Sequence, residues 1–136
     1  MRSAFLDTSG WFAAISPREA QHTATLAAYK EAIESGVQLV TTNLVVAEMQ
    51  ILLMKYRGVA EGVRFLDRLH SDLTHDVVFV DRELERAATD RWLRKFSDAK
   101  LSLADAVSFE VMRQRKIKDV LALDEHFAIA GFSTVP

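Results

Sequence analysis

The sequence predicts an α/β protein with a three-layer fold, in which a small parallel sheet of four or five strands is flanked by helices. Short apolar runs, typical of buried strands, alternate along the chain with longer helical segments. The chain has 136 residues, enough to bury a real core in one domain. Hydrophobic residues make up 49% of it and charged residues 26%, as in ordinary globular proteins. We therefore expect a single domain over residues 1–136.

The first half of the chain begins with a short buried strand at residues 3–6, followed by a helix around residues 11–15. Pro17 opens a second helix that runs to about Glu34 and is closed by Gly36. The next expected elements are a strand at residues 37–40, a helix at residues 44–56 and a helix at residues 59–70. Thr41, Thr42 and Asn43 are N-cap candidates for the helix at residues 44–56.

The second half continues the alternation. The expected elements are a strand at residues 77–80, a helix at residues 82–96, a helix from Ser102 to about Arg115, a strand at residues 120–123 and a further strand within residues 131–135. Asp81 also follows a strand at the edge of Asp7, but its position before residues 82–84 favours a cap for the helix at residues 82–96. Strands separated by helices favour a parallel sheet that is covered on both faces.

Charge and composition limit the classes of function. The net charge of −2 gives no global attraction for nucleic acid, so a polyanion would need a local patch or a metal. The absence of cysteine excludes disulfides and thiolate metal sites. The first apolar stretch is too short to span a membrane and lacks the layout of a signal peptide. We expect a cytoplasmic protein that does not bind membranes.

Asp7 follows the first strand directly and precedes Thr8, Ser9 and a glycine. An acid at this point lies at the carboxyl edge of the sheet, where ligands bind in open α/β folds. The hydroxyl groups beside it could orient a water or a phosphate oxygen. The alternative is that Asp7 only caps the helix that follows it.

Glu48 is the most unusual acid of the sequence, because all its helical neighbours at three and four residues are apolar. These neighbours are Leu44, Val45, Ile51 and Leu52. A carboxylate there is either buried or lines a cleft, and it then needs a cation or hydrogen bonds. The alternative is a salt bridge with Lys55 or with an arginine from elsewhere, but Lys55 is seven residues away.

Two further acids are expected at the same edge. Asp105 has a strong structural alternative, since Ser102 to Asp105 has the pattern of a capping box; the same position also keeps a carboxylate ionised. Asp124 directly follows the strand at residues 120–123 and emerges at the edge of Asp7. Asp98, in the loop before Ser102, is a second-line candidate. The other acids near strands, Asp72, Asp76 and Asp119, belong to the far edge.

Several carboxylates at one edge repel one another and raise each other's pKa, and a divalent cation removes that conflict. A donor set of oxygen atoms alone favours Mg²⁺ or Mn²⁺ over zinc. Acidic clusters that hold such ions cleave phosphodiesters, because the metal neutralises the phosphate and lowers the pKa of a bound water.

Four stretches that carry these acids resemble, in order, the four motifs of the PIN-domain family. They are Phe5-Leu6-Asp7-Thr8-Ser9, Val46-Ala47-Glu48, Leu101-Ser102-Leu103-Ala104-Asp105-Ala106 and Ala122-Leu123-Asp124-Glu125-His126-Phe127. The chain length is also similar to that of the VapC-type toxin ribonucleases, the toxin components of type II toxin–antitoxin pairs.

The resemblance implies a parallel sheet flanked by helices and an Mg²⁺- or Mn²⁺-dependent endoribonuclease. By motif match, Asp7, Glu48, Asp105 and Asp124 are the catalytic, metal-binding acids. Thr8 or Ser9 matches the hydroxyl beside the first acid, and Asp98 matches an acid found ahead of the third motif in many members. The resemblance also implies three partners: an RNA substrate, an antitoxin protein and a second copy of the chain.

Other functions stay open at this point. A regulatory or RNA-binding module with the same fold and no toxin role is the main alternative, although four intact acids argue against it. An aspartyl phosphotransferase would have a second aspartate where the chain has Ser9, and a receiver domain would have two early acids. Basic residues near the edge could guide RNA, although each is more simply part of a solvated helix face: Arg91, Arg94, Lys95 and Lys100.

Residues 44–70 are predicted to form an interface. The helix at residues 44–56 is apolar nearly all round, whereas a helix against one core needs an apolar stripe of only about 100°. The surplus is either covered by the helix at residues 59–70 or exposed as a contact surface. We expect a homodimer and a bound partner peptide here, as the resemblance implies.

Overall fold

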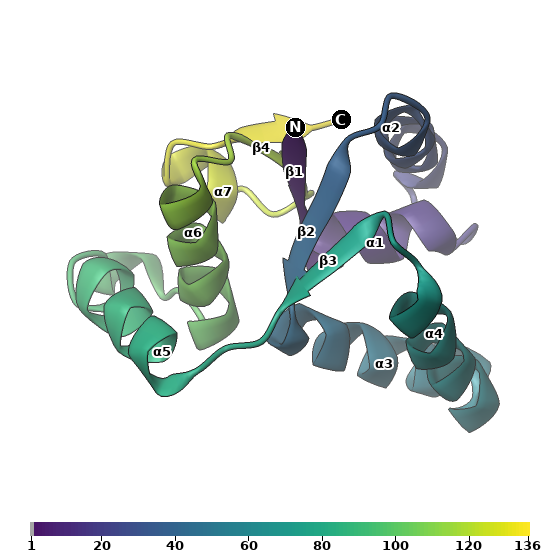
Figure 1. Cartoon of the computed structure of the whole chain (residues 1–136), viewed down its shortest axis with the longest axis horizontal. Helices are drawn as coiled ribbons and strands as arrows, with labels where there is room; N and C mark the ends of the chain where they lie inside the picture. The colour runs from purple at the N-terminus through teal and green to yellow at the C-terminus, as the bar shows by residue number, and fades with distance from the viewer. Residues whose placement is uncertain (1) are drawn as a thin grey trace.

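A computed structural model describes residues 2–136 and shows a five-stranded parallel sheet between two groups of helices (Figure 1). The strands are β1 (Ser3–Leu6), β2 (Gln38–Thr42), β3 (His75–Val78), β4 (Asp119–Leu121) and β5 (Ser133–Val135). Their order in the sheet is β3-β2-β1-β4-β5, and every neighbouring pair is parallel. The predicted α/β class is confirmed.

The helices cover both faces of the sheet. They are α1 (Thr8–Ile15), α2 (His22–Glu34), α3 (Asn43–Arg57), α4 (Val59–Ser71), α5 (Arg82–Ala88), the π-helical segment η1 (Thr89–Leu93), the 3-10 turn η2 (Ser97–Ala99), α6 (Leu103–Arg115) and α7 (His126–Ile129). In Figure 1, α5 and α6 lie on one side of the sheet, and α2 and α4 lie on the other. The expected three layers are therefore present.

Strand β1 is the centre of the sheet. Phe5 pairs with Val40 of β2 on one side and with Val120 of β4 on the other. Because the strands are parallel, their carboxyl ends meet at one edge. Asp119 opens β4 at the opposite edge, where Arg2 contacts it at 3.4 Å, so its predicted exclusion from the site is confirmed.

Two of the predicted helix caps are confirmed by side-chain hydrogen bonds. Thr42 Oγ1 accepts a hydrogen bond from the N–H of Val45, so Thr42 is the cap among the three candidates. Asp81 Oδ1 accepts one from the N–H of Leu84 and caps α5. Such caps satisfy backbone donors that have no partner within the helix.

Several boundaries differ from prediction. Helix α2 begins at His22 rather than Pro17, because residues 17–21 form turns closed by hydrogen bonds such as His22 N–H to Glu19 O. Strand β3 ends at Val78 rather than Val80, since the N–H of Val80 donates to the Asn43 side chain and leaves the strand ladder. The long helix expected at residues 82–96 ends as an α-helix at Ala88 and continues as η1.

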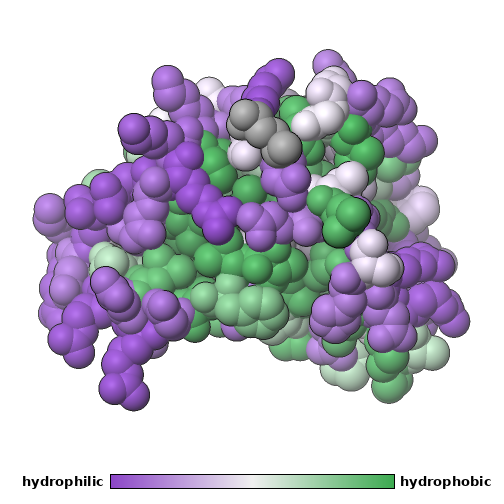
Figure 2. Space-filling model, viewed as in Figure 1, coloured by the Kyte–Doolittle hydropathy of each residue, from purple (hydrophilic) through white to green (hydrophobic). Residues whose placement is uncertain are grey.

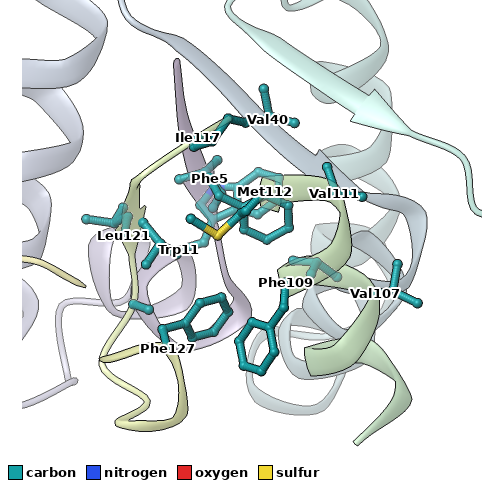
Figure 3. Close-up of a cluster of buried hydrophobic side chains, with 14 of the residues drawn as sticks. Phe5, Trp11, Val40, Val107, Phe109, Val111, Met112, Ile117, Leu121 and Phe127 are labelled. Carbon is teal, nitrogen blue, oxygen red and sulfur yellow. The ribbon is translucent and has the colours of Figure 1, made fainter. Parts of the chain in front are cut away.

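Three phenylalanines in the core join the elements that carry the acids. Phe5, Phe109 and Phe127 are fully buried and come from β1, α6 and α7 (Figure 3). The rings of Phe109 and Phe127 meet edge to face with centroids 4.9 Å apart, and those of Phe5 and Phe127 are 6.5 Å apart. Aromatic pairs at these distances add stability beyond the burial of their area. The core therefore fixes the relative positions of β1, α6 and α7.

The surface carries hydrophobic groups as well as charged ones. Figure 2 shows hydrophobic residues gathered over the middle of one face, where β3 and the segment after it lie in Figure 1, between hydrophilic flanks. Phe79, directly after β3, is 73% exposed. Across residues 2–136, no helix has the length and apolar character needed to cross a membrane.

Candidate active site

Asp7 is the innermost acid of the site and is only 7% exposed. It follows β1 and caps α1, with Oδ2 accepting hydrogen bonds from the N–H of Ser9 at 3.2 Å and from Ser9 Oγ at 2.6 Å. The capping interpretation is therefore correct for Asp7. It does not exclude a role in the site, because the carboxylate also faces other acids.

Ser9 connects this acid to the loop that carries Asp124. Its Oγ donates to Asp7 and accepts from the N–H of Leu123 at 2.9 Å. Gly10 allows the close approach, since a Cβ there would lie 2.3 Å from the carbonyl oxygen of Leu121. Only glycine permits such contact between backbones. The sequence analysis did not single out Gly10, because a glycine after Asp-Thr-Ser reads simply as part of a turn.

Thr8 has the other hydroxyl beside Asp7. Its Oγ1 is buried and has no hydrogen-bond partner within residues 2–136. Buried polar atoms normally have a hydrogen-bond partner, so an unpartnered hydroxyl here indicates a place for a bound group or water. Ser9 is occupied by structural hydrogen bonds, which leaves Thr8 as the hydroxyl free to contact a ligand.

Glu48 lies on α3 and is an exposed residue, so burial, the first of its two expected placements, is excluded. Its carboxylate nevertheless belongs to the acidic edge. Partial shielding from water, with repulsion from Asp7 and Asp105, raises its pKa. The alternative of a salt bridge with Lys55 is also wrong, because no basic residue of the described chain pairs with Glu48.

Asp105 is half-buried in the first turn of α6. Ser102 Oγ accepts from the N–H of Asp105 at 3.0 Å, which confirms the capping role of Ser102. Burial and the charge of Asp124 raise the pKa of Asp105, while Ser102 and His126 act in the opposite direction. The predicted mutual repulsion of the acids is thus present.

Asp124 lies at the same edge as the other acids, but its position relative to β4 differs from the prediction. Strand β4 ends at Leu121, so Asp124 lies in the loop after the strand rather than directly behind it. Its Oδ1 accepts from the N–H of His126 at 2.9 Å, which holds the carboxylate at the start of α7. Helix α7 itself was not predicted, because four residues are too few to show a helical period.

His126 lies beside two of these acids, and the sequence analysis did not single it out, although it stands in the fourth motif. Its Nδ1 lies 3.2 Å from Asp124 Oδ1 and 3.6 Å from Asp105 Oδ2. The three residues offer ligand atoms that lie within 4.8 Å of one another. An imidazole nitrogen therefore lies beside the carboxylate oxygens, an arrangement that the predicted oxygen-only donor set did not include.

The electrostatics of the site fit a divalent cation. Burial, together with the charges of Asp105 and Asp124, raises the pKa of Asp7 to about 6 despite the opposing hydrogen bonds from Ser9. Within residues 2–136, no arginine or lysine forms a salt bridge with any of the four acids. Carboxylates that share one place without an arginine or lysine partner are typical of metal sites.

Other predicted residues lie apart from this cluster. Asp98 is exposed on the 3-10 turn η2 and is not among the charges that raise the pKa of the other acids. Arg91 contacts Glu110 at 3.2 Å and Arg94 contacts Asp90 at 2.8 Å, so both have structural partners. Lys95 and Lys100 are exposed.

Known proteins resemble the chain over nearly all of its length. The 23S rRNA-specific endonuclease VapC20 of Mycobacterium tuberculosis is 32% identical over 133 residues, which cover 96% of each sequence. The crystal structure of Mycobacterium tuberculosis VapC20, described as a Sarcin-Ricin loop cleaving toxin, matches with a TM-score of 0.80 and 31% identity, covering 95% of both chains.

Two more distant structures share the fold. FitAcB from Neisseria gonorrhoeae gives a TM-score of 0.69 at 16% identity, covering 98% of this chain and 96% of the other. A toxin-antitoxin complex from Klebsiella pneumoniae gives 0.65 at 16% identity with the same coverage. The sequence profile of the PIN domain matches residues 4–133. The chain therefore belongs to the PIN-domain family.

Proposed function

We propose that this protein is an endoribonuclease that depends on a divalent metal held by Asp7, Glu48, Asp105 and Asp124. The observation that carries the proposal is the meeting of four acids from four separate parts of the chain at one sheet edge. Burial and mutual repulsion raise the pKa of three of them, and no lysine or arginine within residues 2–136 forms a salt bridge with them. The 32% identity to an rRNA endonuclease over 96% of the chain supports the same activity.

The residues of the site divide the work of phosphodiester hydrolysis. The acids would hold Mg²⁺ or Mn²⁺, which when bound supplies charge to neutralise the phosphate and lowers the pKa of a water nucleophile. Ser9 fixes the carboxylate of Asp7 through its two hydrogen bonds. Thr8 offers its unpartnered hydroxyl to a water or to a phosphate oxygen.

RNA would approach through its backbone. Lys95 and Lys100 are exposed and, unlike Arg91 and Arg94, form no salt bridge within the described residues 2–136. Contacts of lysine with phosphate give an affinity that falls as salt rises, with little choice of sequence. Because the net charge is −2, the metal itself would supply much of the attraction for the scissile phosphate.

Cleavage of a defined RNA tests the activity. The VapC20 relative suggests the substrate, a hairpin with the sequence of the sarcin–ricin loop, with an unrelated hairpin of equal length for comparison. We expect Mn²⁺-dependent cleavage that EDTA stops and that Asp7→Asn abolishes. Binding of either hairpin without cleavage, at any concentration of Mn²⁺ or Mg²⁺, would instead favour an RNA-binding module.

We further propose that the protein is the toxin of a toxin–antitoxin pair. Its VapC20 relative is described as a toxin, and the Klebsiella structure of the same fold is a toxin-antitoxin complex. Expression of the wild-type chain should arrest growth, whereas the Asp7→Asn variant should not. A short neighbouring reading frame whose product binds this chain and restores growth would identify the antitoxin. Growth unaffected by an active nuclease would contradict the toxin role.

The surface of α3 and α4 supports self-association. Helix α4 covers part of α3, since Met49 and Leu53 are buried. The large hydrophobic residues that stay exposed on these helices are Ile51 at 53%, Met54 at 37%, Tyr56 at 64%, Val59 at 65% and Val63 at 50%. Such a group of exposed apolar residues marks an interface.

Light scattering tests this interface. We expect a dimer at micromolar concentration and a monomer after Val63→Lys, with Ala24→Lys on the exposed surface of α2 as the matched control. A wild-type chain that is monomeric at every concentration would contradict the proposal.

A further inference from the structure

We propose that Nδ1 of His126 is a direct ligand of the catalytic metal, which gives the site a mixed nitrogen and oxygen donor set that binds Mn²⁺ in preference to Mg²⁺. This inference rests on the proposed metal-dependent function and adds one ligand and one metal preference to it. It identifies a role for the residue that stands beside two of the acids but is not an acid itself.

The first argument is the state of the nitrogen atom. Nδ1 is buried and has no hydrogen-bond partner within residues 2–136, although Asp124 Oδ1 lies only 3.2 Å away. That contact has the distance of a hydrogen bond without its directional geometry. A buried nitrogen without a hydrogen bond is costly unless something else binds it.

The second argument is the spacing of the donor atoms. Nδ1 lies 3.2 Å from Asp124 Oδ1 and 3.6 Å from Asp105 Oδ2. Neighbouring ligands of an octahedral ion with bonds of about 2.1 Å are separated by about 3 Å, because the bonds meet at right angles. Both separations from Nδ1 are therefore near the spacing that one shared ion imposes, and all three ligand atoms lie within 4.8 Å of one another.

The third argument is the rigidity of the position. The backbone N–H of His126 donates to Asp124 Oδ1, so the histidine and the acid are fixed to each other. The next residue, Phe127, is fully buried and packs edge to face against Phe109 of α6, the helix that carries Asp105. A preorganised donor loses little conformational freedom when it binds an ion.

The donor set determines the preferred metal. Divalent transition-metal ions, Mn²⁺ included, accept an imidazole nitrogen more readily than Mg²⁺, which is held mainly by carboxylate, carbonyl and water oxygens. His126→Gln replaces the nitrogen with a weaker oxygen donor of similar reach. Because the loss of even an outer-shell partner costs about 10–100-fold in metal affinity, we expect Mn²⁺ affinity to fall at least about tenfold. The affinity for Mg²⁺ should change by no more than about threefold.

Pulsed electron paramagnetic resonance of bound Mn²⁺ tests the ligand without reference to activity. The wild-type protein, loaded with less than one equivalent of Mn²⁺, should show the modulation of a directly bound ¹⁴N nucleus. Labelling the histidines with ¹⁵N should replace the ¹⁴N modulation with that of ¹⁵N. The signal should vanish in His126→Gln and persist in His70→Gln, a matched change of an exposed histidine on α4.

The outcomes separate this inference from the function beneath it. Tight Mn²⁺ binding without a nitrogen signal, or a signal that survives in His126→Gln, would overturn the His126 ligand and leave the acidic metal site intact. Failure of the wild-type chain to bind Mn²⁺ at all would overturn both. Calorimetric titration of Mn²⁺ and Mg²⁺ into the wild type and His126→Gln then measures the metal preference. Equal losses of affinity for the two metals in His126→Gln would contradict that preference.

Discussion

Glu110 and Asp7 are two buried carboxylates with opposite surroundings. Glu110 is fully buried on α6, and its oxygens accept hydrogen bonds from Trp92, Arg113 and Gln114 and contact Arg91. Burial alone would raise its pKa, but these bonds lower it on balance. Burial raises the pKa of Asp7 to about 6, and its own hydrogen bonds, both from Ser9, do not offset that effect.

The difference separates a structural acid from a functional one. The charge of Glu110 is neutralised inside the fold, by cations on its own helix and on η1, so it needs nothing from outside. The charge of Asp7 meets further acids instead of cations, and the fold leaves that conflict unresolved. Groups whose pKa is shifted by burial and by like charge mark functional sites more often than groups in satisfied networks.

Removing the Glu110 side chain, whose hydrogen bonds are all made within the fold, should destabilise the protein. Glu110→Ala leaves the indole N–H of Trp92 buried without an acceptor and opens space in the core. We expect a loss of about 3 kcal/mol in the free energy of unfolding, since the arginines are partly exposed and stay solvated. Denaturant titration measures it, with Glu34→Ala on α2 as an exposed control. A loss below about 1 kcal/mol would contradict the structural role.

The raised pKa of Asp7 should appear in the pH dependence of stability. Asp7 has an ordinary pKa of 3.8 and a folded pKa of about 6, so the metal-free folded state binds its proton more tightly than the unfolded state. Stability therefore falls as pH rises from about 4 to about 6, by on the order of 2–3 kcal/mol. Asp7→Asn should flatten the curve over this window. A wild-type protein that gains stability over the same range would contradict the assignment.

Metal should remove the conflict and stabilise the fold. A ligand at about 100 times its dissociation constant adds about 2.7 kcal/mol to native stability, and somewhat less is expected if the unfolded acids also bind. Raising Mn²⁺ from micromolar to millimolar should raise the melting temperature of the wild type. Asp7→Asn should respond much less. Equal shifts in the two proteins would place the bound Mn²⁺ elsewhere.

Much of the architecture could be predicted because hydrophobic periodicity and caps are local signals. The alternation of apolar strands with helices predicted a parallel sheet, and Thr42, Asp81 and Ser102 cap their helices as expected. Strand β3 was displaced by two residues, because its end depends on Asn43 accepting from Val80. That contact joins residues 37 positions apart and leaves no local pattern.

The sequence predicted the acids of the candidate site but not the residues around them. Asp7, Glu48 and Asp105 share electrostatic contacts that strand and helix positions implied. The roles of His126 and Gly10 depend on which atoms approach them in space, which spacing along the chain does not encode. Glu110 was also missed, since an acid among apolar residues on a helix can be either satisfied or functional, and only its partners decide between the two.

Asp105→Asn, measured for cleavage and stability on the same preparation, tests most directly that the acids form a catalytic metal site. The amide keeps part of the local hydrogen bonding and removes one charge from a repulsive cluster. We expect a loss of RNA cleavage of at least about 100-fold, with stability within about 1 kcal/mol of the wild type. Cleavage that remains intact, with a stability loss of about 1 kcal/mol, would show that Asp105 serves only the start of α6.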